Sequence, residues 1–96
     1  MTPPFAVRTT PHYERLAGKL LKGHSELGPL HERVREILAT DPHNLSRRHP
    51  IKKLQGVPPG AGQYRLRLGR FRFRYDISGR DVILHYCGLR REDTYR

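Results

Sequence analysis

The stretch from Gln63 to Tyr75, with the sequence QYRLRLGRFRFRY, constrains the fold more than any other part of the chain. Apolar and basic side chains alternate in it on both sides of Gly69 and Arg70. A period of two is the pattern of a half-buried strand, and a two-residue loop that begins with glycine is the signal of a type II′ turn. The stretch therefore predicts a β-hairpin with an apolar face and an arginine face.

The register that this turn sets places arginines opposite one another. Arg65 is expected to face Arg74. Arg67 is expected to face Arg72 in the same way. Directly opposed like charges destabilise a sheet, and at about 5 Å with an effective dielectric of about 20 each unscreened pair repels by roughly 3 kcal/mol. The arginine face therefore predicts an anionic partner.

The chain as a whole is strongly basic, with a formal net charge of +10 over 96 residues. Arginine supplies most of the charge, since the lysines are only Lys19, Lys22, Lys52 and Lys53. A charge of this size favours a partner that is nucleic acid, an acidic protein or an anionic surface. A chain of this length predicts one domain, residues 1–96.

The compartment is indicated by what the chain lacks. The single cysteine, Cys87, excludes an internal disulfide and is typical of a reducing compartment. The N-terminal MTPPFAV has no basic and apolar signal regions, and no apolar run is long enough to span a membrane. We therefore expect a cytoplasmic protein with no membrane contact. No metal site is predicted, because no i, i+4 pair or cysteine partner accompanies His12, His24, His31, His43 or His49.

Two helices are predicted before the hairpin. Phe5–Thr9 is expected to be a short strand, after which Thr10 can cap a helix that begins at Pro11 and ends at Gly23. A second helix is indicated by one apolar stripe, made of Leu27, Leu30, Val34, Ile37 and Leu38. The sequence predicts an α+β fold, in which the two N-terminal helices form a hairpin that packs on one face of a small antiparallel-rich sheet.

Periodicity fades in residues 43–62, which predict a basic loop with one helical turn at Ile51–Gln55. The alternative interpretation is a solvated run of charges. After the hairpin, Ser78–Asp81 predicts a second turn and Asp81–Gly88 a further strand. The pairs expected across that turn are Phe73 with Tyr86 on the apolar side, and Arg74 with His85 and Arg72 with Cys87 on the other. His85 is thus expected on the arginine face.

An arginine face with a nearby histidine suits cleavage of RNA by its own 2′-hydroxyl. That reaction needs a base, an acid and fixed positive charge. Arginine stays protonated, so binding and charge stabilisation fall to Arg65, Arg67, Arg72, Arg74 and Arg90. Proton transfer would fall to Tyr95, His85 or Glu92. The alternatives are that His85 is an ordinary strand residue and that Tyr95 only packs.

Aromatic side chains of the hairpin offer a second possibility, because exposed rings on a sheet can stack on RNA bases. Phe71, Phe73 and Tyr64 lie on the side that the helices must cover. The sequence therefore predicts that they belong to the core.

Taken together, the order of elements and four segments resemble the RelE/ParE superfamily of bacterial toxin-antitoxin toxins. The segments are IKKLQG from Ile51, YRLRLG from Tyr64, FRFRY from Phe71 and GLRREDTYR from Gly88. The resemblance implies a basic concave face opposite the helices, which in RelE-like members cuts mRNA in the ribosomal A site without a cofactor. It also implies a cognate antitoxin as partner, and contact with operator DNA only through an antitoxin complex.

Carried over by position, the resemblance assigns roles to individual residues. Arg65 and Arg67 match the basic pair of the family's hairpin, and Leu89 stands where such tails often have histidine. The catalytic residues it implies are Arg72, Arg90 and Tyr95, to which the strand pairing adds His85. The expected RNA-binding residues are Arg65, Arg67, Arg74, Lys52, Lys53 and Arg91.

Two other functions stay open at the level of sequence. A ParE-like protein would inhibit DNA gyrase and cut nothing, since similarity of fold does not settle function. A non-catalytic relative would bind RNA with a steep salt dependence and no cleavage.

Overall fold

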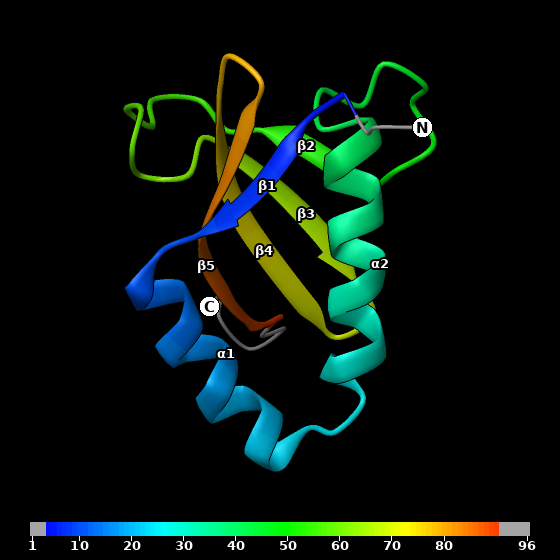
Figure 1. Cartoon of the computed structure of the whole chain (residues 1–96), viewed down its shortest axis with the longest axis vertical. Coiled ribbons are helices and arrows are strands. Elements are labelled where there is room, and N and C mark those ends of the chain that lie inside the picture. The colour runs from blue at the N-terminus through cyan, green and yellow to red at the C-terminus, as the bar shows by residue number, and fades with distance from the viewer. Residues whose placement is uncertain (1–3, 91–96) are drawn as a thin grey trace, which may run out of the picture.

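The computed structural model describes residues 4–90. Its elements are β1 (Ala6–Thr9), α1 (Pro11–Gly23), α2 (Leu27–Thr40), β2 (Ile51–Lys53), β3 (Tyr64–Leu68), β4 (Phe71–Ser78) and β5 (Asp81–Leu89). The strands form one sheet in the order β1-β5-β4-β3-β2, with β1 parallel to β5 and the other pairs antiparallel. Both helices lie on one side of this sheet (Figure 1). The predicted α+β fold is confirmed.

The first helix begins and ends where the sequence predicts. The Thr10 hydroxyl accepts a hydrogen bond from the Tyr13 amide at 3.1 Å, Pro11 is the first helical residue, and Gly23 is the last. In α2 the apolar stripe is buried at Leu27, Val34, Ile37 and Leu38. Neither helix of residues 4–90 is long and apolar enough to cross a membrane.

The central hairpin has the predicted register. Arg65 pairs with Arg74 and Arg67 with Arg72 across β3 and β4. Gly69 has φ of +56°, as the first residue of a type II′ turn requires. The predicted arginine face therefore forms in the folded sheet, and it lies on the side away from the helices.

The core lies between the helices and the other face of the sheet. Phe71, Phe73 and Tyr75 are fully buried there, which confirms that the hairpin aromatics pack rather than face solvent. Tyr64 is half-buried and stacks on Tyr75 at a centroid distance of 5.4 Å. The Tyr75 hydroxyl donates a hydrogen bond of 2.8 Å to the carbonyl of Pro42, so the one polar atom of this buried ring is satisfied.

The predicted helical turn at Ile51–Gln55 is wrong, because this segment begins with the strand β2. Ile51 pairs with Leu66 and packs against the core, and Lys52 pairs with Arg65. The Leu54 amide continues the pairing by donating to the Gln63 carbonyl at 2.7 Å. A lysine-bearing edge strand of three residues is too short for its period to be read from sequence.

The predicted pairing of β5 with β4 is also wrong beyond Tyr75. A register shift between Arg74 and Tyr75 leaves one extra residue in β5, so the pairs that form are Arg74 with Tyr86, Phe73 with Cys87 and Arg72 with Gly88. Such a bulge lets two successive residues point to the same side of a sheet. Tyr86 therefore joins His85 on the arginine face, and Cys87 is buried in the core.

Candidate nucleic-acid interface

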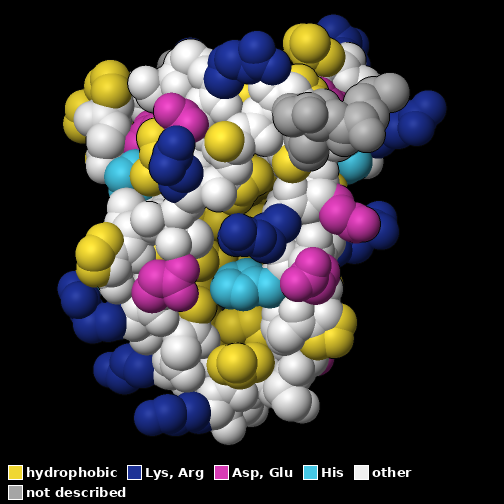
Figure 2. All heavy atoms as spheres, viewed as in Figure 1, with side chains coloured by type: hydrophobic (Ala, Val, Ile, Leu, Met, Phe, Trp, Pro, Cys, Tyr) yellow, Lys and Arg dark blue, Asp and Glu magenta, His cyan; other side chains and the backbone are white. Residues whose placement is uncertain are grey.

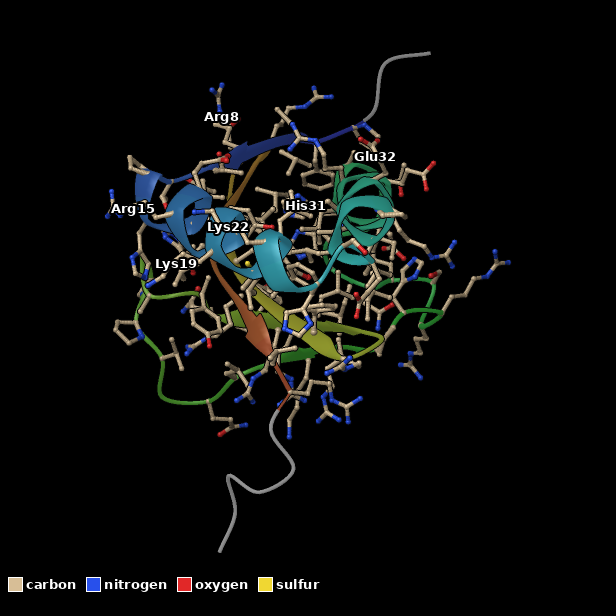
Figure 3. All side chains as sticks on the ribbon, turned by 90° about the horizontal axis from the view of Figure 1, so that it is seen from below. Arg8, Arg15, Lys19, Lys22, His31 and Glu32 are labelled. Atoms are coloured by element: carbon tan, nitrogen blue, oxygen red, sulfur yellow. The ribbon has the colours of Figure 1, made fainter. Side chains whose placement is uncertain are left out.

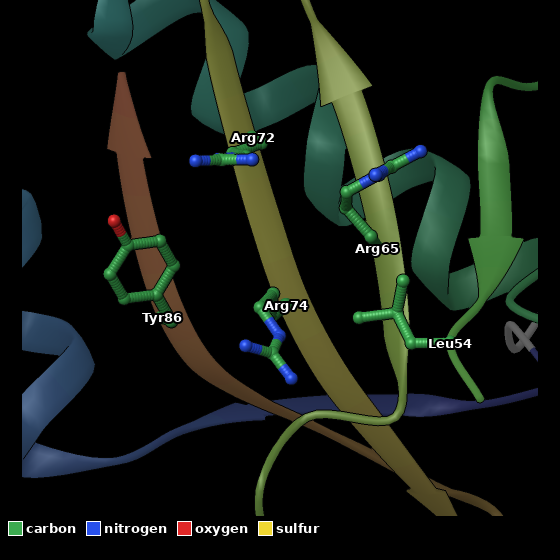
Figure 4. Close-up of a pocket in the computed structure, with 5 residues that line it drawn as sticks. All are labelled: Leu54, Arg65, Arg72, Arg74 and Tyr86. Carbon is green, nitrogen blue, oxygen red and sulfur yellow. The ribbon is translucent and has the colours of Figure 1, made fainter. Parts of the chain in front are cut away.

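The arginine face contains a pocket of about 310 Å³. We call it the arginine pocket, and its lining residues are Leu54, Arg65, Arg72, Arg74 and Tyr86. Figure 4 shows Tyr86 on β5, Arg72 and Arg74 on β4, Arg65 on β3, and Leu54 just past β2. Strands β3 and β4 thus place three guanidinium groups around one hollow, and none of the residues 4–90 that line it is acidic, which makes a suitable surface for phosphate groups.

Arg74 shows how the sheet accommodates opposed arginines. Its Nε and Nη2 donate hydrogen bonds of 3.1 and 3.0 Å to the carbonyl of Gly62. The contact is close, because a Cβ on Gly62 would lie 2.9 Å from the Arg74 Cβ, and Gly62 has φ of +84°. The guanidinium group of Arg74 is therefore held by the loop that precedes β3.

Arg67 and Arg72 are placed differently. Within residues 4–90 the ion pairs are Arg8–Asp81, His49–Asp41, Arg70–Glu26 and His85–Asp76. Neither Arg67 nor Arg72 belongs to one of them, and both side chains are half-buried on the same face. Their charge is available to an external anion.

Asp76 organises the loop beside this face. Its carboxylate is 6% exposed and accepts hydrogen bonds from the amides of Gly60 (3.0 Å), Gly62 (2.9 Å) and Gln63 (3.0 Å). The Nε2 of His85 lies 2.8 Å from the same carboxylate. A buried carboxylate with four donors is satisfied, and it fixes the loop whose Gly62 carbonyl holds Arg74.

His85 lies on the predicted side of the sheet but outside the arginine pocket. It lines an adjoining hollow of about 390 Å³, together with Thr10, His12, Gly60, Ala61, Arg74 and Tyr86. Its Nε2 faces Asp76 and not an arginine. The structure therefore gives His85 a role in holding the loop.

The two lysines predicted to bind RNA point to opposite sides. Lys52 pairs with Arg65 and extends the arginine face. Lys53 pairs with Tyr64, and its Nζ lies 5.7 Å above the Tyr64 ring on the helix side of the sheet. Only Lys52 shares a face with the pocket.

The predicted tail residues are only partly described. Arg90 is exposed just past β5, where its amide donates to the Arg70 carbonyl at 2.7 Å and its Nη1 to the Gly69 carbonyl at 3.4 Å. Arg90 thus lies at the hairpin end of the sheet. Arg91, Glu92 and Tyr95 lie outside the described residues.

The helix side of the molecule offers a contrast. Acidic and basic side chains are mixed there, with apolar surface between the helices (Figure 2). The basic residues along α1 are Arg15, Lys19 and Lys22 (Figure 3). His31 lies between the two helices, where its Nε2 contacts the Tyr13 hydroxyl.

Burial changes the pKa of two groups in or near the core. It lowers the pKa of His31 and raises the pKa of the Cys87 thiol to about 11, so the thiol is not poised as a nucleophile. Residues 4–90 hold no cluster of three potential metal ligands.

Sequence reasoning missed Tyr86, Leu54, Asp76 and Gly62. Tyr86 was assigned to the core by strict alternation, which the bulge interrupts. Asp76 carried a signal, since an aspartate inside an otherwise apolar and basic strand needs donors. Gly62 carried a weaker one, as a glycine directly before a strand.

Comparison with known proteins bears on the fold. The sequence matches no family model and no curated protein sequence. Its structure is similar to a chain in the crystal structure of an archaeal RelE-RelB complex from Pyrococcus horikoshii OT3, with a TM-score of 0.67 and 21% identity over 93% of this chain and 98% of that one. The likeness shows that the fold is RelE-like.

Proposed function

We propose that the protein is the toxin of a toxin-antitoxin pair and acts as a ribosome-dependent endoribonuclease on mRNA. The observation that carries this proposal is the arginine pocket, in which Arg65, Arg72 and Arg74 converge and no carboxylate of the described residues joins the lining. The RelE-like fold supports it independently. A site of one charge sign on a rigid sheet is suited to an anion whose charge grows during the reaction.

The reaction is an attack by the RNA on itself. The 2′-hydroxyl oxygen bonds to the adjacent phosphorus, the bond to the 5′-oxygen breaks, and a 2′,3′-cyclic phosphate and a 5′-hydroxyl result. Arg72 and Arg90 are proposed to stabilise the phosphorane, while Arg65, Arg67, Arg74, Lys52 and Arg91 contact the flanking RNA. Because the attacking group belongs to the RNA, no cofactor is invoked.

Two protons move in this reaction, one from the 2′-hydroxyl and one to the 5′-oxygen. We assign proton transfer to Tyr95. His85 is the second candidate, although its Nε2 is engaged by Asp76. The role proposed for Arg72 does not depend on which of these two residues transfers the protons.

A cognate antitoxin is the proposed partner. The similar chain comes from a RelE-RelB complex, and an acidic protein suits a surface with this charge. Operator DNA would be reached only through such a complex.

The test is inducible expression in cells, with growth and the 5′ ends of mRNA as readouts. Arg72→Ala is expected to lower mRNA cleavage about 100-fold, since loss of one charge-stabilising donor typically costs that much. Tyr95→Phe and His85→Ala separate the two proton-transfer candidates. Arg33→Ala is the matched control, because Arg33 is an exposed arginine on α2, on the helix side.

Undiminished cleavage by Arg72→Ala would overturn the residue assignment. Growth arrest with intact mRNA and blocked DNA supercoiling would replace the nuclease by a gyrase inhibitor.

A further inference from the structure

Tyr86 brings an aromatic ring onto the arginine face. The bulge in β5 turns it outward opposite Arg74, and the ring lines both the arginine pocket and the adjoining hollow. Within residues 4–90 the ring makes no aromatic or cation–π contact. Tyr86 therefore has the position of a surface residue with an unused ring face.

The ring lies flat on the sheet because Gly88 makes room for it. A Cβ on Gly88 would lie 2.2 Å from the Tyr86 hydroxyl oxygen and 2.8 Å from its Cζ. The ring thus occupies the space that any other side chain at position 88 would fill. Figure 4 shows it face-on, beside the guanidinium groups of Arg72 and Arg74.

The surroundings fit a nucleotide better than a free phosphate. Tyr86 lies on β5 and Leu54 just past β2, and these strands are three strand spacings apart, about 14 Å. The side chains between them are Arg72, Arg74 and Arg65. A phosphate alone would use only the arginines. A nucleotide would also place a flat apolar group on the ring, as single-stranded RNA does on other sheets that bind it.

We propose that Tyr86 is a stacking platform for an unpaired nucleobase, so that the arginine pocket takes single-stranded RNA with one base on Tyr86 and the adjoining phosphates on Arg72 and Arg74. This inference rests on the proposed function, whose substrate it specifies. It assigns the apolar part of the site to recognition of a base and the basic part to the backbone. It also assigns Gly88 the role of keeping the platform flat.

Binding of small probes tests the proposal directly. Adenosine 3′,5′-bisphosphate is compared with 1-deoxyribose 3,5-bisphosphate, which has the same phosphates and no base. We expect the adenosine compound to bind about tenfold more tightly, the usual effect of one base on one aromatic ring. We also expect it to shift the ring resonances of Tyr86 upfield in NMR spectra. Equal affinity for both probes with unmoved Tyr86 resonances would overturn the proposal.

Variants separate stacking from other uses of the side chain. Tyr86→Phe is expected to keep the preference for the base, since the ring remains. Tyr86→Leu is expected to lose it while phosphate affinity stays. Gly88→Ala keeps the ring but displaces it, because the new Cβ meets only the far end of the Tyr86 side chain, and should also lose the preference. A preference that survives in both Tyr86→Leu and Gly88→Ala would contradict the stacking role.

These outcomes are independent of cleavage. If the protein prefers the base-bearing probe and cuts no mRNA, the stacking role of Tyr86 stands and the nuclease proposal is wrong. If the protein cuts mRNA and has no preference for the base, the nuclease proposal stands and the stacking role is wrong.

Discussion

His85 and Asp76 are joined across β4 and β5 by a 2.8 Å contact between Nε2 and the carboxylate. The same carboxylate accepts three backbone amides from the loop before β3. The extra residue of the β5 bulge is therefore the one that completes the shell of donors around a buried charge. The ordered loop and the bulged strand therefore meet at one carboxylate.

Replacement of Asp76 should be costly. Asp76→Ala leaves the amides of Gly60, Gly62 and Gln63 without their acceptor. We expect this to lower the free energy of unfolding by about 3 kcal/mol. Urea denaturation measures the loss. Asp81→Ala is the control, because the Arg8–Asp81 pair is exposed and should contribute less than about 1 kcal/mol. Similar losses in the two variants would show that Asp76 does not organise the loop.

Gly62 and Gly56 form a matched pair for a second prediction. Both have positive φ, +84° and +73°, but only Gly62 faces a neighbour, the Arg74 Cβ at 2.9 Å from a built Cβ. Gly56→Ala should cost about 1 kcal/mol from backbone strain alone. Gly62→Ala should cost about 1–3 kcal/mol more, because it adds a steric overlap. Thermal and urea unfolding compare them, and equal costs would rule out the close approach of loop and strand.

Lys52 and Lys53 test which face binds RNA. Lys52→Ala removes a charge from the arginine face and should lower the slope of log affinity against log salt by about 1 for a single-stranded RNA. Lys53→Ala removes the same charge from the other side of β2 and should leave the slope unchanged. Fluorescence anisotropy over a salt series gives both slopes. A larger effect of Lys53→Ala would assign binding to the helix side.

His31 should make stability depend on pH. Burial is the main cause that lowers its pKa from the ordinary value of 6.5, while Glu14 and Glu32 raise it and Arg35 lowers it further. Below pH 6.5 the unfolded chain takes up a proton that the folded protein does not. The stability is therefore complete above pH 6.5 and is lost as the pH falls from there toward the folded pKa.

The measurement compares unfolding free energies at about pH 7.5 and about pH 5.5. His31→Gln keeps a polar side chain near the Tyr13 hydroxyl but does not titrate. We expect this variant to lose less stability than the wild type over the same interval. An identical loss in both proteins would mean that His31 titrates alike in the folded and unfolded states.

The parts of the fold that follow local rules were predictable from sequence. The Arg65–Arg74 pairing follows from a period of two and one glycine turn, and the start of α1 follows from Thr10 and Pro11. The slip in β5 does not, because alternation gives no sign of it and the contact between His85 and Asp76 that accompanies it forms only in the folded protein. Strand β2 was missed because three residues carry no period of their own.

The site was predictable to a similar extent. Arg65, Arg72 and Arg74 were recognised by alternation and do line one pocket. Tyr86 was assigned to the wrong side, and the difference between Lys52 and Lys53 depends on a strand that was not predicted. Alternation identifies the members of a face only up to the first irregularity in the strand.

The bulge at His85 also decides which side chain lies on the arginine face and which one fills the core. Beyond it, the small thiol of Cys87 enters the core near the fully buried Tyr13, and the large phenol of Tyr86 remains outside. A regular strand that kept His85 would exchange them, because it would pair Phe73 with Tyr86 and Arg72 with Cys87, so that a phenol would compete with Tyr13 for space and a thiol would stand among the arginines. We therefore expect the bulge, more than the identity of any one residue of β5, to decide which of these two side chains is buried.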